Sequence, residues 1–325
     1  MKHIQQYQAA FLEYLATHTF TQNPKGLYEP IDYILNLGGK RMRPVALLMS
    51  YAVFKDDFQT ALPAAYAIEI FHNFTLVHDD VIDDAPLRRK KPTVHEKWNL
   101  NTAILSGDVM LVYAYEYLLK TDDKDCLDEV IKAFNKAAIE VCEGQQYDVD
   151  FETQENVTIG EYLKMIELKT SVLLAAAMKI GALVAGSSMK NANHLYEFGK
   201  NMGIAFQLQD DYLDTFGDPE KFGKKVGGDI AKNKKTFLIL KALEVAKTDE
   251  KDHLLKLMSD KVIDENTKIS EVTALLRVLD IPALTRAKKN EYQTLAFDHL
   301  NALQVEEDRK APLIELANML LDREV

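Results

Sequence analysis

Apolar residues recur every three or four positions along nearly the whole chain, as in YLKMIELKTSVLLAAAMKIGALVAG at 162–186. This spacing gathers apolar side chains on one face of an α-helix, and the alternation typical of strands is hard to find. Gly (14) and Pro (9) are scarce among 325 residues, and no Gly/Ser-rich or Pro-rich linker interrupts the pattern. We therefore predict an all-α protein that forms a single domain over residues 1–325.

One segment, 171–186, is apolar almost all round, which marks a helix surrounded by neighbours. A large helical bundle supplies such neighbours. The periodicity and the helix start and stop signals predict helices at 3–18, 43–55, 60–84, 101–120, 125–147, 159–185, 192–216, 234–247, 250–260, 267–278, 281–302 and 309–322.

Charge and composition narrow the class of function. The net charge of −11 argues against a nucleic-acid surface, so an anionic substrate would need local basic groups. Only Cys126 and Cys142 are present, which favours a reducing cytoplasm over a disulfide framework. The N-terminus lacks the apolar core of a signal peptide, and no stretch approaches the ~18 apolar residues of a membrane span. We expect a cytoplasmic protein with no membrane span.

Two DDxxD motifs carry the clearest chemical signal. One lies in HDDVIDDAPLRR and the other in FQLQDDYLD, and their carboxylates are Asp79, Asp80, Asp83, Asp210, Asp211 and Asp214, while Asp84 extends the first cluster by one. On a helix these carboxylates share a face, where repulsion costs roughly 0.2–0.5 kcal/mol per pair. Carboxylate oxygens suit Mg²⁺, which completes its shell with water and substrate phosphates. If the two helices face each other, the motifs form a divided clamp for a diphosphate.

Each motif could instead be a solvated acidic helix end, but both are embedded in apolar segments, which favours the clamp. Basic residues accompany them in GGKRMRP at 38–44, in Arg88-Arg89 and in FGKKVGGDIAKNKKT at 222–236. Pro44 suits a first helical turn, where Lys40 and Arg43 would face an anion. His72 falls on the stripe of Asp79 and Asp83, although a buried structural histidine is the alternative.

Several further landmarks occur in a recognisable order: GQQYD at 144–148, LKT at 168–170 and GKKVGGD at 223–229. Together with GGKRMRP and the two aspartate motifs, they make the chain resemble the trans-isoprenyl diphosphate synthases, the head-to-tail polyprenyl synthetase family, over nearly its whole length. The resemblance implies the isoprenoid synthase fold, a large helical bundle around a deep central cavity, and commonly a homodimer. Lys90 departs from the family pattern, which often has Gly after the two arginines.

The resemblance also implies residue roles. The metal ligands would be Asp79, Asp80, Asp83, Asp148, Asp210, Asp211 and Asp214, with three Mg²⁺ ions when substrate is bound. The allylic diphosphate would be held by Arg88, Lys169 and Lys225. Isopentenyl diphosphate would be held by Lys40, Arg43, His72 and Arg89, with Thr170, Gln207 and Lys234 in support. Catalysis would depend on Asp79, Asp80, Asp83, Lys169 and Asp210.

These residue types suit ionisation of an allylic C–O bond. Metal and basic groups stabilise the departing diphosphate, and a dry apolar environment shelters the carbocation. Isopentenyl diphosphate supplies the alkene, and loss of a proton regenerates an allylic product.

In this family, side chains before the first motif set product length. Phe74 and Thr75 lie roughly 6–8 Å below Asp79 along the helix axis. Phe74 would obstruct a growing chain and Thr75 would not, whereas Phe71, one turn deeper, could be the floor. An aromatic stripe can also be ordinary core. Because short-product members often carry aromatics at both positions, we expect geranylgeranyl diphosphate (C20), with farnesyl (C15) or C25 diphosphate as alternatives.

Three other functions are weaker matches. A class I terpene cyclase usually has an Asn/Ser/Glu second metal motif, whereas this chain has DDYLD. A noncatalytic synthase subunit usually loses one aspartate motif, and both are kept here. A structural calcium binder of the EF-hand type would show a Gly-bearing loop, which the sequence lacks.

Overall fold

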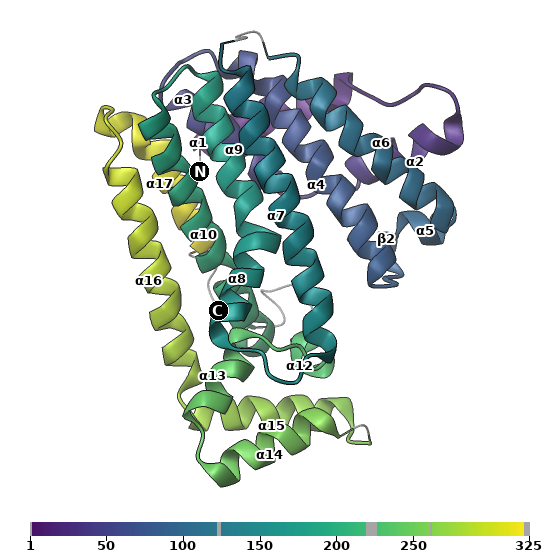
Figure 1. Cartoon of the computed structure of the whole chain (residues 1–325), viewed down its shortest axis with the longest axis vertical. Coiled ribbons are helices and arrows are strands. Elements are labelled where there is room, and N and C mark those ends of the chain that lie inside the picture. Colours follow the sequence, from purple (N-terminus) through teal and green to yellow (C-terminus); the bar gives the residue numbers. More distant parts are fainter. Residues whose placement is uncertain (1, 122–124, 219–225, 261, 322–325) are drawn as a thin grey trace. The chain divides into compact units, whose positions relative to one another are not determined.

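The structure is a computed structural model that describes residues 2–121, 125–218, 226–260 and 262–321 (Figure 1). The described chain is almost entirely helical, which confirms the all-α prediction. The fold divides into two compact units. Unit 1 contains Met1–Ala138, Leu173–Tyr196 and Ala302–Leu316, and unit 2 contains Ile139–Val172, Glu197–Asn301 and Ala317–Val325. The single domain over 1–325 stays a prediction.

The helices are α1 Lys2–Thr17, α2 Lys25–Leu35, α3 Met42–Ala52, α4 Leu62–Ile82, α5 Val94–Lys97, α6 Leu100–Leu118, α7 Leu127–Thr153, α8 Ile159–Ile166, α9 Val172–Val184, α10 Met189–Phe216, α12 Gly228–Ala231, α13 Phe237–Val245, α14 Thr248–Ser259, α15 Glu265–Val278, α16 Ile281–Asn301 and α17 Glu307–Leu321. A 3₁₀ turn at Phe58–Ala61 precedes α4. The sequence did not predict α2, in which Gly26 and Pro30 obscure the periodicity.

Helix α4 carries the first aspartate motif at its C-terminal end. Pro63 is tolerated in its first turn because the amide hydrogen is not needed there. Packing against α3 and α6 buries most of the helix. Tyr66 is fully buried, and its hydroxyl donates to the carbonyl oxygen of His18 at 2.6 Å. The helix ends at Ile82 with the exposed Asp83 as its C-cap.

A short hairpin follows α4, with β1 at Leu87–Arg88 and β2 at Lys91–Pro92 (Figure 1). Its two loop residues, Arg89 and Lys90, have φ of 51° and 64°. A two-residue hairpin favours positive φ at both positions, where Gly or Asn normally stands. The sequence therefore gave no signal for this turn, which presents Arg88 and Arg89.

The predicted continuous helix over 159–185 is interrupted by a π-helical segment, Glu167–Ser171, between α8 and α9. Two glycines of unit 2 approach this segment closely. A Cβ added to Gly144 would lie 2.7 Å from the Lys169 Cα, and one added to Gly203 would lie 2.7 Å from the Ser171 Cα. A π-helical turn holds one residue more than an α-helical turn, and the absence of side chains at Gly144 and Gly203 leaves room for this wider turn. Such π-bulges are frequent at functional sites.

The described residues of unit 2 form apolar clusters around its helices. One cluster joins the end of α10 to α12–α16 through residues such as Leu213, Leu238 and Leu276. Another joins Tyr162 and Ile166 of α8 to Leu208 of α10 and to α13. The latter cluster supports the helical turns that carry the second aspartate motif. Across the described ranges, no helix is both long and apolar enough to span a membrane.

Candidate active site

The first aspartate motif is held by an arginine from the neighbouring hairpin. Arg88 Nε lies 2.9 and 2.8 Å from the two carboxylate oxygens of Asp80, and Arg88 Nη2 lies 3.4 Å from Asp79 Oδ2. Asp80 is only 1% exposed, whereas Asp79 is partly exposed and Asp83 is exposed. Asp80 is thus the buried anchor of Arg88, and Asp79 and Asp83 offer the more accessible carboxylates.

The predicted isopentenyl diphosphate residues cluster in unit 1. Arg43 Nη1 lies 3.2 Å from His72 Nε2. Arg89 Nη1 donates to the carbonyl oxygen of Gly38, and the guanidinium lies against Gly39, where an added Cβ would be 2.6 Å from Nη1. Lys40 follows this glycine pair and is exposed. The two glycines therefore leave room for Arg89 beside the start of α3.

His72 is neutral in this environment. Burial lowers the pKa of His72 well below its usual range, and the positive charges of Arg43, Arg89 and Arg88 lower it further. A neutral ring beside a guanidinium accepts through Nε2, so we assign the proton to Nδ1. His72 then orients Arg43, and the place of both residues in the substrate-binding group stays a prediction.

The depressed pKa predicts how stability depends on pH. The unfolded chain binds a proton at His72 near pH 6.5 and the native protein does not, so stability present above that pH is lost as the pH falls below it. Replacing His72 by glutamine should reduce the loss in unfolding free energy between pH 7.5 and 5.5 by about 1 kcal/mol. Denaturant titrations at both pH values measure this, with His253→Gln, an exposed histidine, as the matched control. An equal loss in His72→Gln and the parent protein would show that His72 titrates normally.

One arginine of GGKRMRP has a structural role that the sequence did not reveal. Arg41 is 4% exposed, forms an ion pair with Glu69 and donates to the carbonyl oxygen of Leu35. Its φ is 52°, so it turns into the core while Arg43 reaches His72. The available signal was Glu69, a lone carboxylate within the apolar stretch of α4 that requires a buried partner.

The second group of predicted residues lies in unit 2. Lys169 Nζ is 2.6 Å from Asp148 Oδ2, so the π-helical segment brings this lysine to α7. Thr170 Oγ1 donates to Gln207 Oε1 at 3.3 Å. Gln207 Nε2 in turn donates to Asp211 Oδ1 at 3.0 Å. These hydrogen bonds join three of the helical segments of unit 2.

The three carboxylates of the second motif have different surroundings. Tyr162, which the sequence did not single out, donates its hydroxyl to Asp211 Oδ2. Burial raises the pKa of Asp211 to about 7, with a smaller contribution from Asp229, while the hydrogen bonds from Tyr162 and Gln207 oppose the shift. Each Asp211 oxygen thus accepts one hydrogen bond and keeps a second lone pair that could coordinate a cation.

Asp214 accepts backbone hydrogen bonds from the start of α12. Its Oδ2 accepts from the Asp229 amide at 2.9 Å, and its carbonyl oxygen accepts from the Gly227 amide. Lys234 Nζ lies 3.8 Å from Asp229 Oδ1. Asp210 is partly buried on α10. Lys225, predicted to hold the allylic diphosphate, lies outside the described residues.

The proposed chain-length residues lie on α4 in unit 1. Phe71 is 1% exposed and packs against Phe74 and Phe134, at ring-centroid distances of 5.5 and 5.1 Å. Phe74 is 9% exposed and its ring also contacts His78. Thr75 is partly buried and donates to the carbonyl oxygen of His72 at 2.8 Å. Phe71 is therefore an integral part of the core, and Phe74 lies at its edge, nearer the aspartates.

Comparison with known proteins identifies the relatives of this chain. Residues 24–276 match the family model described as Polyprenyl synthetase. A short chain isoprenyl diphosphate synthase from Methanocaldococcus jannaschii is 38% identical over 94% of this chain and 91% of that protein. A geranylfarnesyl diphosphate synthase from Natronomonas pharaonis is 36% identical over 93% and 91%, respectively. A crystal structure of a geranylgeranyl pyrophosphate synthase matches with a TM-score of 0.94 and 43% identity, over 99% of each chain.

The helical fold and these matches define a trans-prenyltransferase, as the sequence predicted. The chain belongs to the polyprenyl synthetase family.

Proposed function

We propose that this prenyltransferase condenses isopentenyl diphosphate with an allylic diphosphate and releases chiefly geranylgeranyl diphosphate. The observation that carries the proposal is that a basic side chain accompanies carboxylates in each unit: Arg88 beside Asp79 and Asp80, and Lys169 beside Asp148. Such groups suit a metal-bound diphosphate, which needs both anionic ligands for the metal and cationic donors for its own oxygens.

Members of this family are divalent-metal-dependent prenyl synthases. The residues present fit Mg²⁺, because Asp79, which is partly exposed, and Asp83, which is exposed, lie one turn apart, and oxygen donors are those that Mg²⁺ prefers. We propose Asp79 and Asp83 of unit 1 and Asp210 of unit 2 as principal ligands of three Mg²⁺ ions, with Asp80, Asp148, Asp211 and Asp214 as further ligands. Bound Mg²⁺ would neutralise charge on the departing diphosphate.

The side chains of the protein then have distinct tasks. Arg88 and Lys169 donate to the diphosphate as the allylic C–O bond breaks and the electron pair leaves with oxygen. Arg43, oriented by the neutral His72, holds isopentenyl diphosphate together with Lys40 and Arg89. The alkene attacks the allylic carbon, a C–C bond forms, and a proton passes to the released diphosphate. Thr170, Gln207 and Lys234 position these groups.

Product length provides a test of α4. The relatives of this chain include proteins named geranylgeranyl diphosphate synthase and geranylfarnesyl diphosphate synthase. Replacing Phe74 by alanine should shift the main product from C20 to C25 or longer, because it removes an aromatic ring one turn before Asp79. Chromatography of the dephosphorylated products measures the shift, and Thr75→Ala on the same turn should leave the product length unchanged. If Phe74→Ala still makes C20 alone, Phe74 does not limit the chain.

The reaction itself is tested by release of inorganic diphosphate. The protein should release diphosphate when isopentenyl diphosphate and an allylic diphosphate are both supplied with Mg²⁺, and should stop when the metal is chelated. A folded protein that binds both substrates yet releases none would instead be a noncatalytic subunit.

We also propose that the protein is a cytoplasmic homodimer. The exposed side chains Leu105, Val112 and Leu119, which are 58, 65 and 53% exposed, recur every seven residues along and just beyond α6. A second copy of the chain would cover such an apolar stripe. Val112→Glu should convert the dimer to a monomer in sedimentation equilibrium, and an unchanged mass would place the interface elsewhere.

A further inference from the structure

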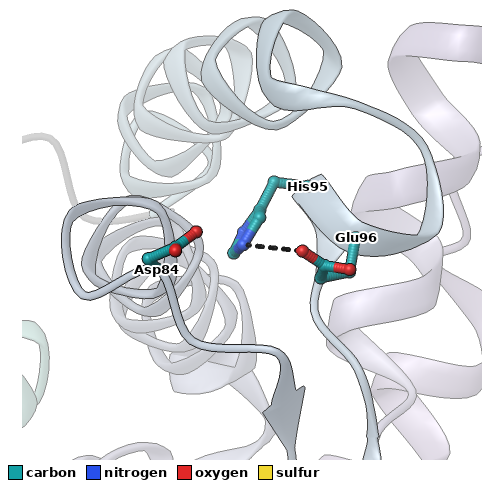
Figure 2. A group of neighbouring side chains, drawn as sticks. All are labelled: Asp84, His95 and Glu96. Carbon is teal, nitrogen blue, oxygen red and sulfur yellow. Dashed lines mark ion pairs between the residues drawn. The ribbon is translucent and has the colours of Figure 1, made fainter.

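A second group of potential metal ligands lies beside the Arg88–Arg89 hairpin. Unlike the two aspartate motifs, this group includes a histidine. Asp84, His95 and Glu96 each offer a ligand atom, and these three atoms lie within 4.8 Å of one another (Figure 2). Asp84 precedes the hairpin, whereas His95 and Glu96 follow it on the short helix α5. All three residues belong to unit 1.

The histidine provides an independent indication of a ligand. The side chain of His95 is only 10% exposed, yet neither Nδ1 nor Nε2 has a hydrogen-bond partner among the described residues. The nearest charged group is Glu96, whose Oε1 lies 3.8 Å from Nε2, too far for a hydrogen bond. A buried imidazole normally has at least one partner. Figure 2 shows the ring between the carboxylates of Asp84 and Glu96.

We propose that Asp84, His95 and Glu96 bind a divalent transition-metal cation, such as Zn²⁺, at a site distinct from the Mg²⁺ ligands of the aspartate motifs. An imidazole nitrogen suits Zn²⁺ and its neighbours in the first transition series better than Mg²⁺. The two carboxylates balance the charge of the cation. Ligand atoms around tetrahedral Zn²⁺ are about 3.4 Å apart. Small rotations of the exposed Asp84 and Glu96 side chains would bring the atoms to that spacing.

The position of the site indicates its consequence. A cation bound at once by Asp84 and by His95 and Glu96 closes the segment 84–95, which contains β1, β2 and the left-handed residues Arg89 and Lys90. This segment also carries Arg88, which holds Asp80. The cation would therefore fix the hairpin that presents both arginines.

Equilibrium dialysis against Zn²⁺ tests the proposal, with Mg²⁺ in large excess to occupy the aspartate motifs. The parent protein should retain one Zn²⁺ per chain. His95→Gln and Glu96→Gln should each weaken binding at least tenfold, and the second variant removes only an exposed carboxylate, so a folding defect is not expected. His253→Gln, at an exposed histidine on α14, and Asp79→Asn should retain the cation. Unchanged affinity in His95→Gln and Glu96→Gln, or loss of Zn²⁺ in Asp79→Asn, would overturn the proposal.

Limited trypsin digestion provides a second measurement. Arg89 and Lys90 are exposed at the hairpin, and trypsin can cleave after either residue, whereas Pro92 protects the bond after Lys91. Zn²⁺ should slow cleavage there about tenfold in the parent protein and leave the rate in Glu96→Gln unchanged. Equal protection in both proteins would contradict the proposed closure of the segment.

Discussion

Changing Asp79 to asparagine is expected to lower kcat about 1,000-fold. A carboxylate that holds a catalytic metal contributes several kcal/mol of transition-state stabilisation, and about 4 kcal/mol corresponds to that factor. Asparagine has nearly the same shape and keeps an oxygen 3.4 Å from Arg88, so the local packing should be preserved. Asp79 also lies in the last turn of α4, where a negative charge opposes the helix dipole. The variant should therefore be as stable as the parent protein or slightly more stable.

Steady-state kinetics with saturating substrates and Mg²⁺ measure the effect, and circular dichroism with thermal unfolding checks the fold. Asp128→Asn on α7 is the matched control, because Asp128 is exposed and its ion pair among the described residues is with a helix neighbour, Lys132. If Asp79→Asn keeps kcat within about threefold of the parent value, the first motif does not hold the catalytic metal.

Replacing Lys169 by glutamine should reduce kcat/KM for the allylic diphosphate about 100-fold. A hydrogen bond from a charged donor contributes roughly 1.5–3 kcal/mol, and the upper end of this range corresponds to that factor. Lys169 projects from the π-helical segment toward Asp148, at 2.6 Å. The loss should arise mainly because the leaving diphosphate is stabilised less in the transition state. The KM for isopentenyl diphosphate should change less.

Lys164→Gln provides the comparison, because Lys164 is an exposed lysine on the preceding helix that pairs with Glu167 at 3.0 Å. Its kcat/KM should stay within about twofold of the parent value. Equal losses in Lys164→Gln and Lys169→Gln would show that general positive charge, and not the position of Lys169, is what the substrate requires.

The helical fold could be predicted because its cause is local. Apolar spacing in α4, α6 and α10 is strong enough to define each helix within a few residues. The π-helical segment could not be predicted, because it depends on Gly144 and Gly203, which are distant in sequence from Lys169. The hairpin was not predicted either, but here the cause is local. Its turn residues, Arg89 and Lys90, have a local conformation that their residue types disfavour.

Within the candidate site, the sequence indicated which residues belong to the motifs, but not the burial or the hydrogen-bond partners of each. Asp79, Asp80 and Asp83 are equivalent in a motif, yet Asp80 is buried against Arg88 and Asp83 is exposed. Asp211 similarly differs from the other carboxylates of its motif, because it accepts a hydrogen bond from Tyr162, 49 residues away in the sequence. Burial and hydrogen bonding depend on the packed structure, so a repeated motif alone cannot assign individual roles.

The most direct test of the proposed function is product analysis after incubation with Mg²⁺, isopentenyl diphosphate and, in separate reactions, the C5, C10 and C15 allylic diphosphates. Synthesis of a discrete C20 product from these primers is the expected result. A shorter or longer product would retain the condensation and overturn the role assigned to Phe74. No condensation from any primer, by protein shown to be folded, would contradict the proposed function.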